Sequence, residues 1–246
     1  MYTLKSAYEM KCISLKGIPM LLRQMLDIYD LIDKPSASGN EVADFLRGRG
    51  ASDVTVKRVS GERGGTDCMK ILIPGSNGKS NGGEAPTLGI VGRLGGLGAR
   101  PELIGAVSDG DGALAALTAA LKLVEMHEQG DVLTGDVIVA THVCPDAPTL
   151  PHEPVPFMDS PIDMETMNRM EVDPRMDAVV SIDTTKGNRI INVNGIAISP
   201  TVMQGYILSV SNDLMDVMTR VTGKMPQVFA LSQQDITPYG NDLYHL

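Results

Sequence analysis

Short apolar runs and longer amphipathic stretches alternate along this chain, and that alternation constrains the fold more than any other feature of the sequence. Apolar runs bounded by turn residues predict strands, and apolar residues at helical spacing predict helices. The predicted strands cover residues 54–59, 69–73, 87–91, 137–143, 178–182, 189–198 and 227–231. The predicted helices cover residues 20–34, 39–49, 113–128 and 202–221. A further short helix is expected to begin at Ser160. This order predicts an α/β fold, a three-layer sandwich with a mixed, mostly parallel central sheet.

Two glycine-rich segments follow predicted strands, and neither has the spacing of a nucleotide-binding loop. Residues 74–86 are polar and are expected to form an exposed hairpin loop between two strands. Within this loop, Gly-Lys-Ser at 78–80 is similar to the end of a phosphate-binding loop, but Ile73 stands at the position of the first glycine. Residues 92–98 miss the GxGxxG spacing of dinucleotide-binding folds. Nucleotide binding is therefore not expected at either segment.

The charge balance and the cysteines restrict the partners and the location of the protein. The 246 residues include 30 acidic and 21 basic side chains, a net charge of -9, whereas a nucleic-acid-binding surface normally needs a basic excess. The three cysteines lie far apart and form neither a disulfide framework nor a CxxC zinc pattern, which favours a reducing compartment. No apolar segment has the length of a membrane span or the form of a signal peptide. We therefore expect a cytoplasmic protein that binds neither nucleic acid nor membranes.

The chain shows no boundary that would divide it into several domains. Residues 1–19 have weak periodicity and are expected to form an N-terminal arm. Residues 20–246 contain no repeat and no linker, so they are expected to form a single α/β domain.

Polar side chains follow several predicted strands, at the edge where ligands of parallel sheets gather. The candidates are Arg93, Asp109, Asp111, His142, Cys144, Asp146 and Asp183. Asp109 and Asp111 precede the long helix, so Asp109 fits either an N-cap residue or a cation ligand. His142 ends a strand, where a histidine is either a hydrogen-bonded structural residue or a ligand. Neither an HExxH helix nor a GxSxG turn occurs, so the common zinc-protease and serine-hydrolase signatures are absent.

Several segments occur in an order that is known from another group of proteins. They are LIDKPSASGNE (31–41), GAVSDGDG (105–112), GDVIVAT (135–141), SID (181–183) and the loop at 233–242. This order resembles the co-catalytic zinc aminopeptidases and their carboxypeptidase and deacylase relatives. In detail, THVCPDAPTLPH (141–152) is similar to the signature of an uncharacterised bacterial family, the domain of unknown function number 1177. The resemblance implies a fold similar to zinc-dependent exopeptidases.

The chain departs from those enzymes at two ligand positions. Where they have His-x-Asp, this chain has Arg-Leu-Gly at 93–95, and a permanent cation there would repel a metal. Where they have an acidic pair, this chain has His-Val-Cys at 142–144. The resemblance therefore leaves only Asp109 and Asp183 as inherited ligands, and the standard two-zinc site is not expected. His142 can act as a further ligand because imidazole also binds zinc.

The first of three functional hypotheses is a divergent hydrolase of small amides or peptides. One divalent metal ion, zinc by the resemblance, is held by Asp109, His142 and Asp183 and activates water. A base must then take the proton from that water, and Asp111 and Asp146 are the candidates.

The other two hypotheses need no metal. In one, the protein binds a small anionic or peptide-like ligand whose carboxylate pairs with Arg93 and Arg100. In the other, it is an inactive subunit that keeps the fold for assembly. The resemblance also leads us to expect a further strand and helix after residue 246, and hence a C-terminal truncation. An open sheet edge there needs cover from another chain or from the arm, and we expect a homo-oligomer.

Overall fold

The computed structural model describes residues 21–93, 106, 110–151, 157–184, 193–203, 205–229, 237–240 and 243–245. The helices are α1 (Leu21–Ile32), α2 (Gly39–Gly48), the 3-10 helix η2 (Lys79–Asn81), α3 (Asp111–Glu128), α4 (Met164–Glu171) and α5 (Asn212–Thr222). The strands are β1 (Asp53–Gly61), β2 (Gly64–Ile73), β3 (Leu88–Gly92), β4 (Val137–Val143), β5 (Thr149–Leu150), β6 (Phe157–Met158), β7 (Ala178–Ile182), β8 (Ala197–Ile198), β9 (Thr201–Met203), β10 (Tyr206–Ile207), β11 (Gln227–Val228), β12 (Thr237–Gly240) and β13 (Leu243–His245). None of these helices has the length and apolar character that a membrane crossing requires. The arm predicted at 1–19 lies outside the described residues.

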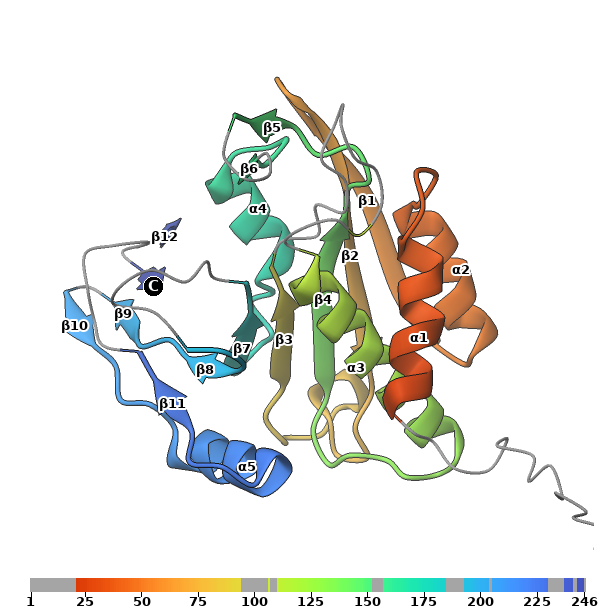
Figure 1. Cartoon of the computed structure of the whole chain (residues 1–246). Helices are drawn as coiled ribbons and strands as arrows, with labels where there is room; N and C mark the ends of the chain where they lie inside the picture. The colour runs from red at the N-terminus through yellow and green to blue at the C-terminus, as the bar shows by residue number, and fades with distance from the viewer. Residues whose placement is uncertain are drawn as a thin grey trace, which may run out of the picture.

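Five strands form the central sheet in the order β1-β2-β4-β3-β7 (Figure 1). β2 is antiparallel to both β1 and β4, whereas β3 is parallel to both β4 and β7. The predicted mixed sheet is therefore confirmed, and its parallel part is the half formed by β4, β3 and β7. Smaller sheets have the orders β10-β9-β13-β12, β11-β8 and β5-β6.

Helices cover both faces of the central sheet, as the three-layer prediction requires. Successive residues of a strand point to opposite faces. On β2, Met69 packs in the main core with residues of α1, α2 and α3, whereas Cys68 packs against Met167 of α4. Figure 1 shows α1, α2 and α3 grouped on one side of the sheet. The three-layer α/β prediction is confirmed for the described part of the chain.

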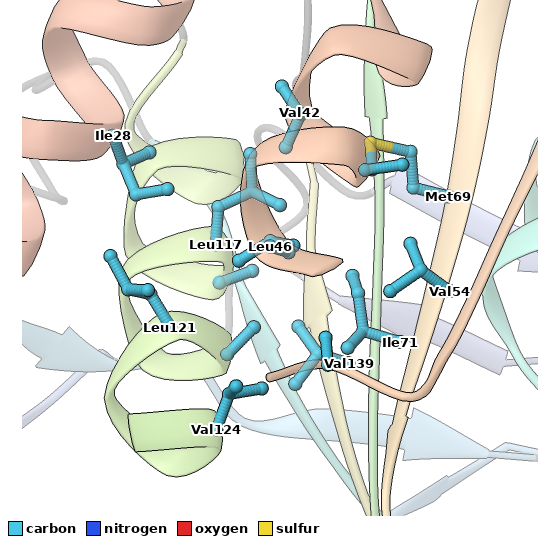
Figure 2. Close-up of a cluster of buried hydrophobic side chains, with 14 of the residues drawn as sticks. Ile28, Val42, Leu46, Val54, Met69, Ile71, Leu117, Leu121, Val124 and Val139 are labelled. Carbon is cyan, nitrogen blue, oxygen red and sulfur yellow. The ribbon is translucent and has the colours of Figure 1, made fainter. Parts of the chain in front are cut away.

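The main core lies between α1, α2, α3 and one face of the sheet (Figure 2). Its side chains are mainly aliphatic, as expected for a chain that has no Trp and three Phe. Figure 2 labels Ile28, Val42, Leu46, Val54, Met69, Ile71, Leu117, Leu121, Val124 and Val139. Leu46, Ile71 and Leu121 are fully buried, and truncating such a side chain to Ala typically costs about 2–5 kcal/mol. This core holds the sheet and therefore fixes the strand ends that carry the candidate site.

The connection between β2 and β3 corrects the prediction of a hairpin loop at residues 74–86. A hairpin would place β2 beside β3, but β4 lies between them. The loop instead crosses the amino end of β4, where Ser76 N donates to Leu133 O at 2.8 Å and the next amide donates to Thr134 O at 2.9 Å. The apolar pattern identifies both strands correctly, but it contains no information about a later strand that is inserted between them.

Capping rules predict the start of α2 correctly and that of α4 incorrectly. Ser38 caps α2, and its Oγ accepts a hydrogen bond from Glu41 N at 3.2 Å. The cap of α4 is Asp163, which accepts from Thr166 N at 2.8 Å, whereas the sequence prediction placed the start at Ser160. Ser160 Oγ instead donates to Ile162 O at 2.6 Å, so its hydroxyl serves a turn before the helix.

The C-terminal part is less buried and less helical than predicted. β7 has the predicted bounds, but none of its residues is buried, because it is the end strand of the central sheet, and Val179 is 44 % exposed. The helix predicted at 202–221 is confirmed only for α5. Strands β9 and β10 occupy the first half, with a turn at Gly205, whose φ of +80° is a conformation that glycine adopts readily.

Candidate functional site

The register of the parallel strands aligns three of the candidate residues. Val91 of β3 lies beside Ala140 of β4 and beside Ser181 of β7. Two residues beyond these aligned positions lie Arg93 after β3, His142 in β4 and Asp183 after β7. The three residues therefore occupy one row at the carboxyl ends of adjacent parallel strands, the edge where ligands of such sheets bind.

The amino end of α3 is packed directly on the same edge. A Cβ atom on Gly112 would lie 1.8 Å from Arg93 O, and a Cβ atom on Gly92 would lie 2.2 Å from Gly112 O. Only glycine fits these two positions, so they let the first turn of α3 touch the ends of β3 and β7. The cap residue is Gly110, and Asp111 follows it with an exposed side chain. Asp111 Oδ2 accepts a hydrogen bond from Thr184 Oγ1 at 3.1 Å, which holds it beside Asp183.

A buried group of charged side chains underlies this edge. Glu171, the last residue of α4, is 0 % exposed, and Arg93 and His142 are 4 % and 6 % exposed. One carboxylate oxygen of Glu171 accepts from Arg93 Nη1, and the other lies 2.8 Å from His142 Nδ1. Arg93 Nη1 also donates to Asn168 Oδ1 at 2.9 Å. We call Arg93, His142 and Glu171 the buried triad.

The triad determines how the His142 imidazole is protonated. A carboxylate can only accept hydrogen bonds, so a neutral His142 that bonds to Glu171 carries its proton on Nδ1. Nε2 then carries the lone pair of the imidazole ring. Histidines that bind metals in proteins are usually held through their other nitrogen in this way.

Arg93 does not present an uncompensated charge to the site. The sequence alone suggests that a cation at position 93 would repel a metal ion. In the fold, however, its guanidinium is buried against α4 and forms an ion pair with Glu171. The negative charge of Glu171 offsets the positive charge of Arg93, which weakens the electrostatic objection to a cation at this edge.

Cys144 and Asp146 follow β4, but they differ in accessibility. Asp146 is exposed, whereas Cys144 is 1 % exposed and its Sγ lies 3.5 Å from Gly65 O. Burial, together with the nearby Asp146 carboxylate, raises the pKa of the Cys144 thiol to about 11. The thiolate is the nucleophilic form of cysteine, so Cys144 is not activated for catalysis at neutral pH.

Two predicted site residues, Asp109 and Arg100, lie outside the described residues. Among the residues that the structure describes, no three His, Cys, Asp or Glu side chains come close enough together to hold a metal ion. His142 and Asp183 are therefore the two predicted ligands whose positions are described, and the proposed third ligand is Asp109.

Glu171 and Asn168 contact the predicted site residues but were not predicted themselves. In the sequence they belong to the short helix α4, and four elements (α3, β4, β5 and β6) separate it from β3. One signal was available: Met164, Met167 and Glu171 recur at helical spacing, so a glutamate occupies a position on the apolar face of α4. A carboxylate at such a position requires a buried partner, and a histidine or arginine at a strand end is a suitable one.

The motif that is similar to a phosphate-binding loop has a structural role. Asp136 accepts hydrogen bonds from Gly75 N, Ser80 N and Ser80 Oγ, each at 2.8 Å. Lys79 Nζ binds the Asp177 carboxylate at 2.6 Å. Burial acts to raise the pKa of Asp136, but the hydrogen bonds from Gly75 and Ser80 outweigh it and hold this pKa below its usual value. The donors that a phosphate would need are thus bound to carboxylates of the chain itself.

Two of the solved structures that are similar to this chain each match about half of it. One is the bottromycin maturation enzyme BotP in complex with Mn, with 15 % identity and a TM-score of 0.36 over 52 % of this chain and 31 % of that chain. Another is a tomato leucine aminopeptidase mutant, with 13 % identity and a TM-score of 0.33 over 50 % of this chain and 27 % of that chain. The matched region thus spans about a third or less of either protein. No curated protein matches the chain.

One protein family matches most of the chain. Its description is "Protein of unknown function (DUF1177)", and the match covers residues 57–246, which include the whole buried triad. This result confirms the resemblance of residues 141–152 to that family's signature. The chain belongs to the DUF1177 family.

Proposed function

We propose that this protein is a divergent metal-dependent hydrolase of small amides or peptides, with His142 as its central site residue. The observation that carries the proposal is the contact between His142 Nδ1 and the fully buried Glu171 carboxylate at 2.8 Å. A hydrophobic side chain would fill the same space without burying charge. A buried carboxylate that orients an imidazole is instead the usual support of a histidine that works through Nε2.

The donor set suits a divalent ion of borderline hardness such as zinc. His142 supplies an imidazole nitrogen, and Asp183 and Asp109 supply carboxylate oxygens. When bound, such an ion lowers the pKa of a water ligand and polarises a carbonyl group. Asp183 lies in the same row of strand ends as His142, which supports its assignment as the second ligand.

The remaining residues at the edge have separate roles in this proposal. Glu171 holds the His142 ring, and Arg93 positions the Glu171 carboxylate by donating to its other oxygen. Asp111 is the better candidate for the base, because its carboxylate is exposed and is linked through Thr184 to the segment of Asp183. Asp146 is exposed too, but its carboxylate lies 3.8 Å from the thiol of Cys144, which is not activated for catalysis.

The metal-free alternative has less support. It requires Arg93 to pair with the carboxylate of a ligand, but the Arg93 side chain is 4 % exposed and its Nη1 already donates to Glu171 and Asn168. A ligand would have to displace a buried ion pair, at a cost of several kcal/mol.

Metal analysis of the purified full chain tests the proposal. After reconstitution with zinc, manganese or cobalt and removal of unbound ions, we expect stoichiometric metal in the wild type and loss of it in His142→Ala and Asp183→Asn. His127→Ala is the matched control, because His127 lies half-exposed in the last turn of α3. Folded wild-type protein that retains none of these metals would overturn the metal-dependent function.

Hydrolysis of a panel of dipeptides and N-acyl amides provides the second readout. We expect activity that depends on added metal and is lost in His142→Ala, while Asp111→Asn lowers the rate without removing the metal. A folded, metal-loaded protein without activity on the whole panel would refute hydrolysis while leaving the metal site in place.

A further inference from the structure

Helix α1 is apolar on two opposite sides, although only one side faces the described part of the fold. Ile28 and Ile32 are buried in the main core, next to α3. Leu22, Met25, Leu26 and Tyr29 point away from that core, and their exposed fractions lie between 36 % and 54 %. We call these four residues the outer face of α1. They follow the spacing i, i+3, i+4, i+7, so they form one continuous stripe on the helix.

This stripe is not what a helix at the surface of a monomer normally presents. Surface helices are apolar toward the core and polar toward water, whereas helices that are apolar all round are buried. The inner side even contains Gln24, which is 1 % exposed and donates to Glu125 Oε2 at 2.6 Å. Of the two sides, the outer one is the more uniformly apolar. Contiguous exposed apolar patches of this kind mark interaction sites.

The charges beside the stripe make α1 complementary to a second copy of itself. Arg23 and Asp30 lie on the same border of the outer face, seven residues apart, which corresponds to about 10 Å along the helix axis. In an antiparallel pair related by a twofold axis, Arg23 of each copy lies opposite Asp30 of the other. The same operation places Leu22 near Tyr29 of the other copy and Met25 near Leu26, so large side chains meet large side chains.

We propose that the outer face of α1 is the interface of a homodimer in which the two α1 helices pack antiparallel across a twofold axis. The occupant is a second copy of this chain, because the symmetric arrangement adds Asp30 of the other copy to the partner that Arg23 already has in its own helix, Asp27 at 3.9 Å. This inference is independent of the proposed hydrolase function, since it involves none of the residues at the carboxyl ends of β3, β4 and β7.

The oligomeric state of the full chain tests the interface. By sedimentation equilibrium we expect a dimer for the wild type and a dissociation constant raised at least about tenfold in Leu26→Lys, because a lysine is introduced into the centre of the apolar contact. Val221→Lys on α5 is the control, since Val221 is even more exposed, at 79 %, and should leave the dimer unchanged. Both positions are exposed, so unchanged thermal unfolding at low protein concentration checks that the fold is intact.

Charge reversal tests the antiparallel arrangement itself. Arg23→Asp places two acidic residues opposite each other and Asp30→Arg places two arginines opposite each other, so each should weaken the dimer severalfold. The double variant Arg23→Asp with Asp30→Arg restores opposite charges and should recover most of the lost affinity. A wild type that stays monomeric at the highest soluble concentration, as expected if residues 1–20 or a different protein cover the stripe, overturns the proposal. A wild-type dimer whose dissociation constant is unchanged by Leu26→Lys also overturns the proposal.

Discussion

A buried carboxylate lies near each end of strand β4, Asp136 at the amino end and Glu171 of α4 at the carboxyl end. The two carboxylates are bound in different ways. At the amino end, Asp136 is bound by two backbone amides and a serine hydroxyl. At the carboxyl end, Glu171 is bound by an arginine and lies against a histidine. Backbone amides carry no net charge and do not titrate, so the first arrangement is suited to fixing a loop. An imidazole can change its protonation state and its ligands, so the second arrangement is suited to chemistry.

The two buried carboxylates are also stabilised by different kinds of group. The groups that bind Asp136 directly are neutral donors, so its negative charge is stabilised mainly by dipoles, as at a helix N-terminus, with a smaller contribution from the more distant Arg175. The charges of Arg93 and Glu171 compensate each other, so the loss of one partner leaves the other buried without that compensation. The two carboxylates should therefore respond differently to substitution.

Replacing Glu171 should give the largest effect. In Glu171→Leu, Arg93 stays buried without its counter-ion, so the free energy of unfolding should fall by about 3–5 kcal/mol. Urea denaturation measures this change in the free energy of unfolding, and Glu165→Ala on the exposed side of α4 is the control. The double variant Arg93→Met with Glu171→Leu should recover much of the loss, because no unpaired charge remains. A Glu171→Leu protein as stable as the control would show that Arg93 does not depend on this pair.

Replacing Asp136 should have a smaller effect, because the donors that it leaves behind are neutral. We expect Asp136→Ala to lower the free energy of unfolding by about 2 kcal/mol, and Asp44→Ala, an exposed substitution on α2, to have little effect. Sulfate or phosphate should restore part of the stability of Asp136→Ala, since the freed amides of Gly75 and Ser80 can bind an anion. If these anions stabilise the wild type equally, they do not act at this loop.

Acid should remove the contribution of Asp136 to stability. The pKa of Asp136 is lower in the folded chain than in the unfolded chain, so its contribution to stability is present above about pH 4 and is lost as the pH falls through the folded pKa. Wild-type stability should therefore decrease on acidification below about pH 4, and Asp136→Asn should show a shallower decrease. Denaturant unfolding at several pH values measures both slopes, and parallel slopes would contradict the hydrogen-bonding account of this pKa.

Thiol labelling probes the carboxyl end of β4 without changing stability. Burial raises the pKa of Cys68 to about 12 and that of Cys144 to about 11. Iodoacetamide at about pH 8 should therefore leave both thiols unmodified in the native protein and modify them in urea, which mass spectrometry can quantify for each cysteine. Rapid native labelling of Cys144 would mean that this end of β4 is open and holds a reactive nucleophile.

The sequence predicts most individual elements of this fold, because hydrophobic periodicity is a local property. β4 has the predicted bounds, and the capping box at Ser38 locates α2. The pattern does not reveal that β4 lies between β2 and β3, because strand order depends on contacts between distant segments. The helical spacing that identifies α1 runs through Leu22, Met25, Leu26, Tyr29 and Ile32, and of these residues only Ile32 is buried in the core.

The candidate site is predictable only in part, for a similar reason. Polar residues after strands are visible in the sequence, and Arg93, His142 and Asp183 do share one row of strand ends. The partner that orients His142 comes from α4, on the opposite face from the main core. The helical spacing of α4 indicates that Glu171 needs a buried partner, but it does not identify His142 as that partner. The apolar run at residues 178–182 predicts a buried strand, but β7 is largely exposed. Such a run does not reveal whether neighbouring elements cover the strand.

The position of β4 in the sheet also bears on how the protein is made on the ribosome. β2 and β3 leave the ribosome before β4, yet each has β4 as its neighbour, and the other neighbour of β3 is the still later β7. A nascent chain that ends before Val137 therefore exposes one unpaired edge of β2 and both edges of β3. Pairing over such sequence separations is slow, and open edges are prone to intermolecular pairing. The first half of this polypeptide should therefore depend on chaperone protection until Val143 has emerged, and synonymous changes that slow translation within residues 93–143 should increase its aggregation.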